Sequence, residues 1–468
     1  FGAPKHLQSP TTPYFVAQFG TIGGYLTPVP ESEVDAAWDK WFKLDFSQFI
    51  DPMISSGIAN PHGGSMASQL VLQKEWNSTD NIIFYATHKM DAGAVRNSEG
   101  VCRYLDQYLD AVNKYAPWLN VTFAQLFNEP NYSWFVNSFG GNQEKAVQGY
   151  VDLFNVVDKH LRQTHPKTQL LGPCLASSEF FSWGGWKEWT IPVLKGAEYD
   201  LEYYNYHNYD TAAVSHLAWV QMLQAQALAL GKDKPRAIVT EMNDDATIKV
   251  AANKFEWWSE QLFYALENPD KFHALEYFLT VWRPGMKGNL VYSDGNTYHS
   301  TDTYWLYWVL RHTRGQLRHV EMPALKDLKV IACSPSENQL VLSLFNNTGR
   351  TVEVNLDSGL TDTSSIKQLV RYAAWRKNQQ VQHVQDTLAS QTNPKVHIRN
   401  GEVQSYVWDL NQPLTADAGK LDQQEYYAKT VAQKFGKTGL NTRIATPRLP
   451  QSDETVAVRF AVFSDDVL

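Results

Sequence analysis

The stretch TFAQLFNEPNYSW, Thr122–Trp134, joins the pattern of a buried strand to an ionisable side chain. The run up to Phe127 is mainly apolar, as expected of a strand enclosed on both faces. Asn128 and Glu129 follow directly, and Pro130 then ends the strand because it cannot donate a ladder hydrogen bond. The sequence thus places a carboxylate at the mouth of an apolar strand.

Short apolar runs alternate with amphipathic helices on both sides of this stretch, from about residue 12 to residue 315. Further strands are predicted at Tyr14–Gly20, Asn81–Lys89, Thr168–Leu175, Leu201–Tyr209, Arg236–Asn243 and Ala274–Trp282. Helices are predicted from Ser98 to before Pro117 and near Gln143–Leu161, His216–Leu230, Lys254–Leu266 and Asp302–Thr313. Apolar strands that are each followed by a helix are typical of a parallel sheet covered on both faces.

The fold class predicted from this alternation is α/β, a (β/α)8 TIM barrel over residues 12–315 with a C-terminal antiparallel β-sandwich domain over residues 316–468. Residues 32–65 are expected to hold a further barrel strand, for which Leu44–Ile50 is the candidate. Short strands separated by turn residues, such as LKVIACS, NQLVLSLFN, RTVEVNL, VQSYVWDL and TVAVRFAVF, predict the sandwich. Residues 1–11 are a candidate addition to it, and residues 411–452 stay open between linker and sheet.

Composition excludes several functional classes. The net charge of −8 provides no basic field for nucleic acid, and no apolar run reaches the roughly 18 residues of a membrane helix. Cys102, Cys174 and Cys333 form no CxxC pair and no metal framework, so buried free thiols are expected. A chain that begins at Phe1 without Met fits a trimmed export signal, which predicts a secreted or periplasmic protein, although a piece cut from a longer chain would begin in the same way.

A second carboxylate occupies the matching place on another strand. Glu241 lies near the end of the strand RAIVTEMN, and two predicted strands separate it from the strand that carries Glu129. In a parallel barrel the carboxyl ends of all strands line one face, so both acids are expected at the same mouth. Paired carboxylates can hydrolyse a glycosidic bond, with retention at a separation of about 5–5.5 Å and inversion at about 6.5–9.5 Å.

FNEPN followed by a glutamate three strands later resembles glycoside hydrolase clan A, which carries an Asn-Glu pair after barrel strand four and a glutamate after strand seven. The resemblance implies that Glu129 is the acid/base, that Glu241 is the nucleophile and that Asn128 binds the hydroxyl next to the reacting carbon. A barrel with one β-sandwich is similar to families 39 and 30, and the barrel is compatible with family 86 agarases and porphyranases. A family 86-like or family 39-like retaining enzyme is expected. The clan's usual arginine after strand two is not found.

Other strand ends and loops supply candidate substrate-binding residues. His207 and Tyr209 end one strand, where the clan often keeps a residue that bonds the nucleophile, although a histidine in a polar turn is the structural alternative. The remaining candidates are His88 and Trp282 at strand ends, the loop residues Trp134, Trp183 and Trp186 for sugar stacking, and Arg283 for an acidic glycan. The tryptophans could equally anchor their own loops, and Arg283 could be a solvated charge. Asp244 and Asp245 are interpreted as loop and cap residues, and no metal or cofactor is expected.

These patterns predict a retaining glycoside hydrolase that cleaves a β-glycosidic bond in a plant or algal polysaccharide, with an agarose or porphyran-type galactan favoured and endo action expected. One alternative is an exo-acting β-glycosidase resembling a β-xylosidase. Another is a non-catalytic carbohydrate-binding barrel that uses its aromatic side chains alone. The expected partner is a polysaccharide or oligosaccharide, with neither nucleic acid nor membrane.

Overall fold

The structure is a computed structural model that describes residues 14–17, 83–85, 92–115, 122–176, 185–209, 211–243, 254–277, 291–293, 298–318, 320–323, 325–360, 362–414, 449–451 and 454–460. The chain divides into two compact units. The parallel unit comprises residues 14–252 and 271–301, and the sandwich unit comprises residues 1–13, 253–270 and 302–468. The predicted domain boundary between residues 315 and 316 stays a prediction.

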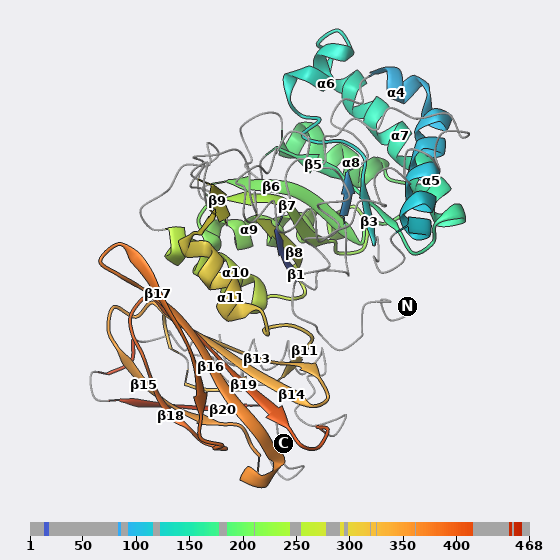
Figure 1. Cartoon of the computed structure of the whole chain (residues 1–468). Helices are drawn as coiled ribbons and strands as arrows, with labels where there is room; N and C mark the ends of the chain where they lie inside the picture. The colour runs from blue at the N-terminus through green and yellow to red at the C-terminus, as the bar shows by residue number, and fades with distance from the viewer. Residues whose placement is uncertain are drawn as a thin grey trace, which may run out of the picture. The chain divides into compact units, whose positions relative to one another are not determined.

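The parallel unit is built on two sheets whose described strands pair in parallel. One sheet has the order β1 (Tyr14–Ala17), β8 (Phe272–Tyr277), β7 (Arg236–Asn243), β6 (Tyr203–Tyr209) and β5 (Pro173–Leu175). The other has the order β2 (Ile83–Tyr85), β3 (Phe123–Gln125) and β4 (Gln169–Leu171). The last strand pairs with the first, β8 with β1, which is how a (β/α)8 barrel closes. Figure 1 shows these strands in the central part of this unit.

One residue, Gly172, separates β4 from β5, where the sequence predicted a single strand. A Cβ at Gly172 would lie 2.4 Å from the Tyr150 hydroxyl and 2.7 Å from the Phe154 ring, so the helix behind this position leaves no room for a side chain. At Gly172 the chain leaves the sheet that contains β4 and enters the sheet that contains β5. The candidate strand Leu44–Ile50 lies outside the described residues.

The strands of the parallel unit share an apolar cluster to which five of them contribute. Its buried members are Phe123 of β3, Leu171 of β4, Tyr203 of β6, Ile238 of β7 and Ala274 of β8. Because alternate residues of a strand point to opposite faces, one residue from each strand is enough to build a shared layer. A layer of this kind is the packed interior expected of a barrel.

Helices follow the strands as the alternation predicts. The described helices of this unit are α4 (Ala92–Arg96), α5 (Ser98–Tyr115), α6 (Ser133–Ser138), α7 (Gln143–Thr164), the π-helix η1 (Trp186–Thr190), α8 (Ile191–Gly196) and α9 (Ala213–Ala229). The Asn142 side chain caps the start of α7 by accepting a hydrogen bond from Lys145 N at 2.9 Å. Gly231, just after the end of α9, has a φ of +74°, the left-handed conformation that commonly ends a helix. A short antiparallel pair, β9 (Val291–Ser293) and β10 (Tyr298–Ser300), completes the described elements. No helix in the described ranges is long and apolar enough to cross a membrane.

In its described residues the sandwich unit contains two sheets and the α-helices α10 (Lys254–Leu266) and α11 (Asp302–Leu310). The six-stranded sheet has the order β11 (Gln316–Arg318), β13 (Leu328–Ser336), β14 (Gln339–Asn346), β19 (Glu402–Leu410), β16 (Ile366–Lys377) and β17 (Gln380–Leu388). The four-stranded sheet has the order β12 (Val320–Glu321), β20 (Thr455–Phe460), β15 (Val352–Asp357) and β18 (Lys395–Ile398). A 3-10 turn, η2 (Thr363–Ser365), precedes β16.

Sheet pairing in this unit is antiparallel with one departure from the prediction, because β15 and β20 pair in parallel. About a hundred residues of chain separate these two strands. Only neighbours joined by a hairpin are bound to run antiparallel, whereas a long connection permits either direction. The four-stranded sheet therefore contains one parallel pair, β15–β20, where the sequence predicted antiparallel pairing.

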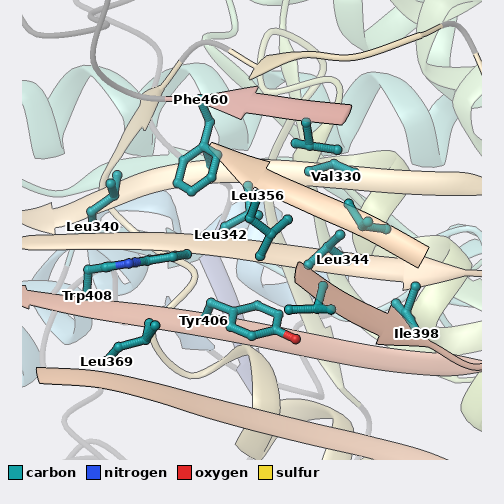
Figure 2. Close-up of a cluster of buried hydrophobic side chains, with 14 of the residues drawn as sticks. Val330, Leu340, Leu342, Leu344, Leu356, Leu369, Ile398, Tyr406, Trp408 and Phe460 are labelled. Atoms are coloured by element: carbon teal, nitrogen blue, oxygen red, sulfur yellow. The ribbon is translucent and has the colours of Figure 1, made fainter. Parts of the chain in front are cut away.

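The core of the sandwich unit lies between its two sheets. Figure 2 shows Leu340, Leu342 and Leu344 of β14 on the same side of their strand, together with Leu356 of β15 and Phe460 of β20. The opposite face of the six-stranded sheet receives the two helices. Phe345 contacts Phe263 of α10 with ring centroids 5.7 Å apart, and Tyr372 contacts Trp308 of α11 at 5.2 Å. Burial on both faces explains why the sequence of β14 shows little alternation.

Leu342→Ala is expected to lower the free energy of unfolding of the sandwich unit by about 2–5 kcal/mol, because the truncated side chain leaves a cavity in a fully buried layer. Urea unfolding followed by tryptophan fluorescence measures this loss. Gln385→Ala, at an exposed position of β17, should change the same transition by no more than about 0.5 kcal/mol. Equal effects of the two substitutions would contradict the assigned core.

Candidate active site

A bulge at the end of β7 aims Glu241 into the parallel unit. Tyr206 of β6 pairs with Val239 of β7, but the next residue, His207, pairs with Glu241, so Thr240 is the extra residue. Side chains alternate along a regular strand, and an inserted residue reverses that alternation. Glu241 and His207 consequently become neighbours that project from the same side of adjacent strands.

Glu129 reaches the same place through a strained turn after β3. Its φ of 50° lies in the left-handed region, which residues other than glycine seldom adopt. The Glu129 N–H donates to the carbonyl of Cys174 at 3.0 Å, and Asn131 Oδ1 accepts from Ala176 N at 2.9 Å. These two bonds tie the turn to the end of β5. Surroundings that hold a backbone in such a conformation are frequent at functional sites.

The two carboxylates meet around the imidazole of His207. His207 Nδ1 lies 2.7 Å from Glu129 Oε1 and 3.3 Å from Glu241 Oε2. One ligand-type atom from each of the three residues lies within 4.8 Å of the other two. The Tyr209 hydroxyl donates to Glu241 Oε2 at 2.8 Å, so this oxygen receives a bond from the same strand that carries His207.

The other side of the His207 ring rests on Cys174, which has φ of 57°. Cys174 Sγ lies 3.2 Å from His207 Nε2 and 3.7 Å from Thr240 Oγ1. The Cys174 N–H donates to Asn205 Oδ1 at 3.0 Å, and Asn205 Nδ2 donates to Gln125 Oε1 at 2.7 Å. A buried chain of hydrogen bonds through three strands therefore fixes the backbone of Cys174, from which the sulfur reaches the ring.

Exposure is graded across this cluster. The side chain of Glu129 is 20% exposed and that of Glu241 is 8% exposed, whereas His207 is fully buried. Cys174 is 1% exposed. A substrate that approaches from solvent therefore meets the two carboxylates first, with the imidazole and the thiol behind them.

Burial and mutual repulsion control protonation in this cluster. Burial, reinforced by the nearby charge of Glu129, raises the pKa of Glu241 to about 7, against the opposing influence of His207 and of the Tyr209 hydrogen bond. Burial alone would lower the pKa of His207, but the carboxylate of Glu241, the Cys174 sulfur and Glu129 outweigh it and raise that pKa well above its ordinary value. Near neutral pH Glu241 is thus partly protonated and lies beside a cationic imidazole.

Two neighbouring tyrosines stay protonated for related reasons. Burial and the Glu241 carboxylate raise the pKa of Tyr209 well above its usual range, so its hydroxyl keeps the proton that it donates. Burial and then Glu129 raise the pKa of Tyr132. Neither group can act as a base at neutral pH.

Three kinds of chemistry suit such a set of residues. Paired carboxylates within about 5 Å suit acid and nucleophile roles at one glycosidic bond. Glu129, His207 and Glu241 could also be ligands of one metal ion, but ligands about 2.1 Å from zinc lie roughly 3.4 Å apart in a tetrahedral site, and the 2.7 Å contact of His207 with Glu129 is a hydrogen bond.

Cys174, His207 and Glu129 also have the connectivity of a thiol, base and orienting acid. A nucleophile has to touch its substrate, however, and Cys174 is 1% exposed and lies behind the imidazole. The carboxylate pair is therefore the arrangement that a substrate can reach.

The structure brings together several of the residues singled out from the sequence. Glu129, Glu241, His207 and Tyr209 form the cluster, and Asn128 Oδ1 lies 3.8 Å from Cys174 Sγ at its edge. The candidate residues His88, Trp183, Trp282 and Arg283, together with Asp244 and Asp245, lie outside the described residues.

Trp134 and Trp186 are half-buried and make ring contacts of the packing type. Trp134 lies edge-on to Phe127 at 6.5 Å and to Phe135 at 5.6 Å. Trp186 lies edge-on to Trp219 at 6.1 Å. These contacts fit the loop-anchor alternative, and sugar stacking by either ring stays a prediction.

Sequence reasoning missed the parts that Cys174, Thr240 and Tyr132 play in the cluster. The position of Cys174 at the end of a predicted strand was the available signal, but it predicts only a buried thiol. The three cysteines are indeed free and buried. A bulge such as the one at Thr240 leaves no signal in hydrophobic periodicity, and Tyr132 lies in a turn.

The raised pKa of Glu241 predicts how stability depends on pH. Its folded value of about 7 exceeds the ordinary value of 4.5, so folding favours the protonated carboxyl. This contribution is fully present below about pH 4.5 and is lost as pH rises through about 7. Thermal unfolding should therefore show Tm falling between about pH 5 and pH 8, with a smaller fall in Glu241→Gln. Parallel curves for the two proteins would contradict the shift.

Comparisons with protein-family models and with curated proteins find no match. Solved structures are similar at low identity. A β-porphyranase of glycoside hydrolase family 86 from Bacteroides plebeius is 14% identical over 87% of this chain and 76% of its own, with a TM-score of 0.52. A family 51 α-L-arabinofuranosidase from Thermotoga petrophila is 12% identical over 86% of this chain and 98% of its own, with a TM-score of 0.54.

This chain spans 56% of the length of a family 86 protein crystallised with neoagarooctaose, which is 11% identical over 68% of this chain with a TM-score of 0.49. The similarities of the family 86 β-porphyranase and the family 51 arabinofuranosidase concern the fold: a region of parallel α/β units followed by antiparallel sheets. They do not resolve one family. The chain is thus similar in fold to solved glycoside hydrolases of clan A, at low sequence identity.

Proposed function

We propose that this protein is a retaining glycoside hydrolase that cleaves a β-glycosidic bond in a plant or algal polysaccharide by double displacement. The observation that carries the proposal is the meeting of Glu129 and Glu241, which lie 112 positions apart in the chain, with carboxylate oxygens no more than 4.8 Å apart. That separation suits direct attack by a carboxylate and leaves little room for the intervening water of an inverting enzyme.

In the first step Glu129 gives its proton to the glycosidic oxygen as the leaving alcohol departs. Glu241 attacks the anomeric carbon as a carboxylate, which forms a glycosyl ester. The Tyr209 hydroxyl holds Glu241 Oε2 at 2.8 Å and so orients the attacking group. Glu129 is suited to the acid role because it is the more exposed of the two carboxyls and can reach a leaving group.

In the second step Glu129 accepts a proton from water, the oxygen of that water attacks the anomeric carbon, and Glu241 leaves as a carboxylate. At the end of this step Glu129 carries a proton again and Glu241 is a carboxylate. Burial favours that proton on Glu241 in the free protein, whereas the first step needs it on Glu129. His207 Nδ1 lies within reach of both carboxylates, so its N–H can follow the negative charge as the proton changes place.

An agarose or porphyran-type galactan is the favoured substrate class, with endo action and an extracytoplasmic location. The β-porphyranase among the structural neighbours supports a galactan, but an α-L-arabinofuranosidase is equally similar in fold. The choice of substrate class therefore has to be made by an activity assay. An exo-acting β-glycosidase and a non-catalytic carbohydrate-binding barrel are the alternatives.

Purified protein incubated with agarose, porphyran, carrageenan, xylan and β-glucans should release reducing ends from one of them. Products that first appear as a ladder of oligosaccharides indicate endo action, and a single small sugar indicates exo action. Proton NMR of the earliest product should show the β-anomer. An initial α-anomer would contradict double displacement, and binding of a glycan without release of reducing ends would favour the binding-barrel alternative.

A further inference from the structure

The imidazole of His207 is fully enclosed and meets an electron-rich atom at each nitrogen. Nδ1 faces Glu129 Oε1 at 2.7 Å and Glu241 Oε2 at 3.3 Å, whereas Nε2 faces Cys174 Sγ at 3.2 Å. A buried polar hydrogen costs free energy unless it finds an acceptor. The ring environment therefore offers acceptors to two N–H groups at once.

We propose that Cys174 is a positioning residue whose sulfur accepts the Nε2–H of His207 and thereby holds the ring as an imidazolium, a fixed counter-charge for the carboxylate pair. The proposal rests on the function proposed above and extends it by a residue that makes no contact with substrate. It assigns to the thiol the role of acceptor, although sulfur is a weak one.

The charges around the ring agree with this assignment. Glu129 comes from the turn after β3, Glu241 from β7 and Cys174 from β5, and they are the charged or titratable groups that face His207 most closely. Tyr209 acts through its bond to Glu241, and Tyr132 lies near Glu129. Both carboxyl groups face the Nδ1 side of the ring, at 2.7 Å and 3.3 Å, so an imidazolium places positive charge where negative charge gathers. The raised pKa of His207 agrees with this placement.

The network beneath the sulfur explains how such a weak acceptor is kept in place. Asn205 is fully buried and accepts from the Cys174 N–H, and Gln125 holds Asn205 in turn. The left-handed backbone of Cys174 gives its side chain a direction that a regular strand position would not. The sulfur is therefore positioned independently of the ring that it supports.

The protonation of His207 can be read directly from histidine nitrogen resonances. In protein labelled with ¹⁵N-histidine, with His207 assigned by its absence from His207→Gln, both ring nitrogens should carry hydrogen at pH 6.5. In Cys174→Ala the ring should lose its Nε2 proton at a lower pH, by about one unit or more, because the freed N–H has no acceptor. Cys174→Ser, whose hydroxyl can accept, should stay closer to the wild type. A wild-type ring that carries one proton, with Nε2 bare, would overturn the proposal.

Activity gives a second readout. A neutral ring no longer stabilises carboxylate charge, so both limbs of the kcat/KM profile should move upward in pH by about one unit in Cys174→Ala. Cys102→Ala removes another buried thiol from the same unit and should leave both limbs in place. If the kcat/KM profile of Cys174→Ala does not shift and only its Tm falls, Cys174 has a packing role alone and the proposal is wrong.

The two proposals fail in different ways. A protein that hydrolyses no glycan but shows a doubly protonated His207 that depends on Cys174 would refute the proposed function and leave the ring assignment standing. A hydrolase whose His207 resonances are indifferent to Cys174→Ala would refute the ring assignment alone.

Discussion

Glu241→Gln is expected to lower kcat/KM for glycan hydrolysis by roughly 10⁴-fold or more, because an amide cannot form the glycosyl ester. The amide is nearly isosteric with the carboxylate, and its oxygen can still accept from the Tyr209 hydroxyl, so the fold of the site should persist. Release of reducing ends under substrate-limited conditions measures the loss. Thermal unfolding of the same variant verifies that the protein remains folded.

Glu202→Gln is the matched control for this change. Glu202 immediately precedes β6, at the end of the strand opposite His207 and Tyr209, and its carboxylate lies 3.9 Å from Arg236 Nη2. This half-buried pair lies at the far end of the strand from the two catalytic candidates, so activity should stay within about twofold of the wild type. Turnover by Glu241→Gln comparable to that of Glu202→Gln would remove Glu241 from the mechanism.

Glu129→Ala is expected to produce a loss that depends on the leaving group. Polysaccharide hydrolysis should fall by about 10²–10⁴-fold, because the departing alcohol needs a proton. An aryl glycoside with an acidic phenol needs none, so formation of the glycosyl ester should remain fast and its hydrolysis should become limiting. A burst of phenol, followed by slow turnover, is the expected time course.

Azide provides the corresponding rescue. A small anion that fits the space left by the missing carboxylate can attack the glycosyl ester without a general base, so it should accelerate turnover and yield a β-glycosyl azide. Glu129→Gln, which fills that space, should respond less. Equal loss on polysaccharide and on activated substrates, with no response to azide, would contradict an acid/base role for Glu129.

The parallel arrangement and the convergence of the two acids were predictable because they depend on order along the chain. The predicted strands up to Phe127 and at Arg236–Asn243 carry clear apolar runs. β7 has the predicted bounds, whereas β3 ends two residues earlier than predicted, at Gln125. Parallel strands place their carboxyl ends on one face whatever their side chains are. The helix Lys254–Leu266 also has its predicted bounds, because Asn268 and Pro269 mark its end in the sequence.

The rest depends on features that hydrophobic periodicity does not record. The bulge at Thr240 makes Glu241 face inward, and the left-handed conformation of Cys174 aims its sulfur at His207. The strands β16, β17 and β18 were not predicted. β17 is polar and largely exposed at the edge of its sheet, where a strand needs no apolar face.

Mass analysis of the trapped glycosyl ester would identify the nucleophile itself. Glu129→Ala, mixed with an activated aryl glycoside of the sugar identified by the substrate screen and quenched in acid during the burst, should gain the mass of one glycosyl unit. Peptide mapping should place that unit on the peptide that contains Glu241. A burst without any adduct, or an adduct on the peptide that contains Cys174, would contradict double displacement through Glu241.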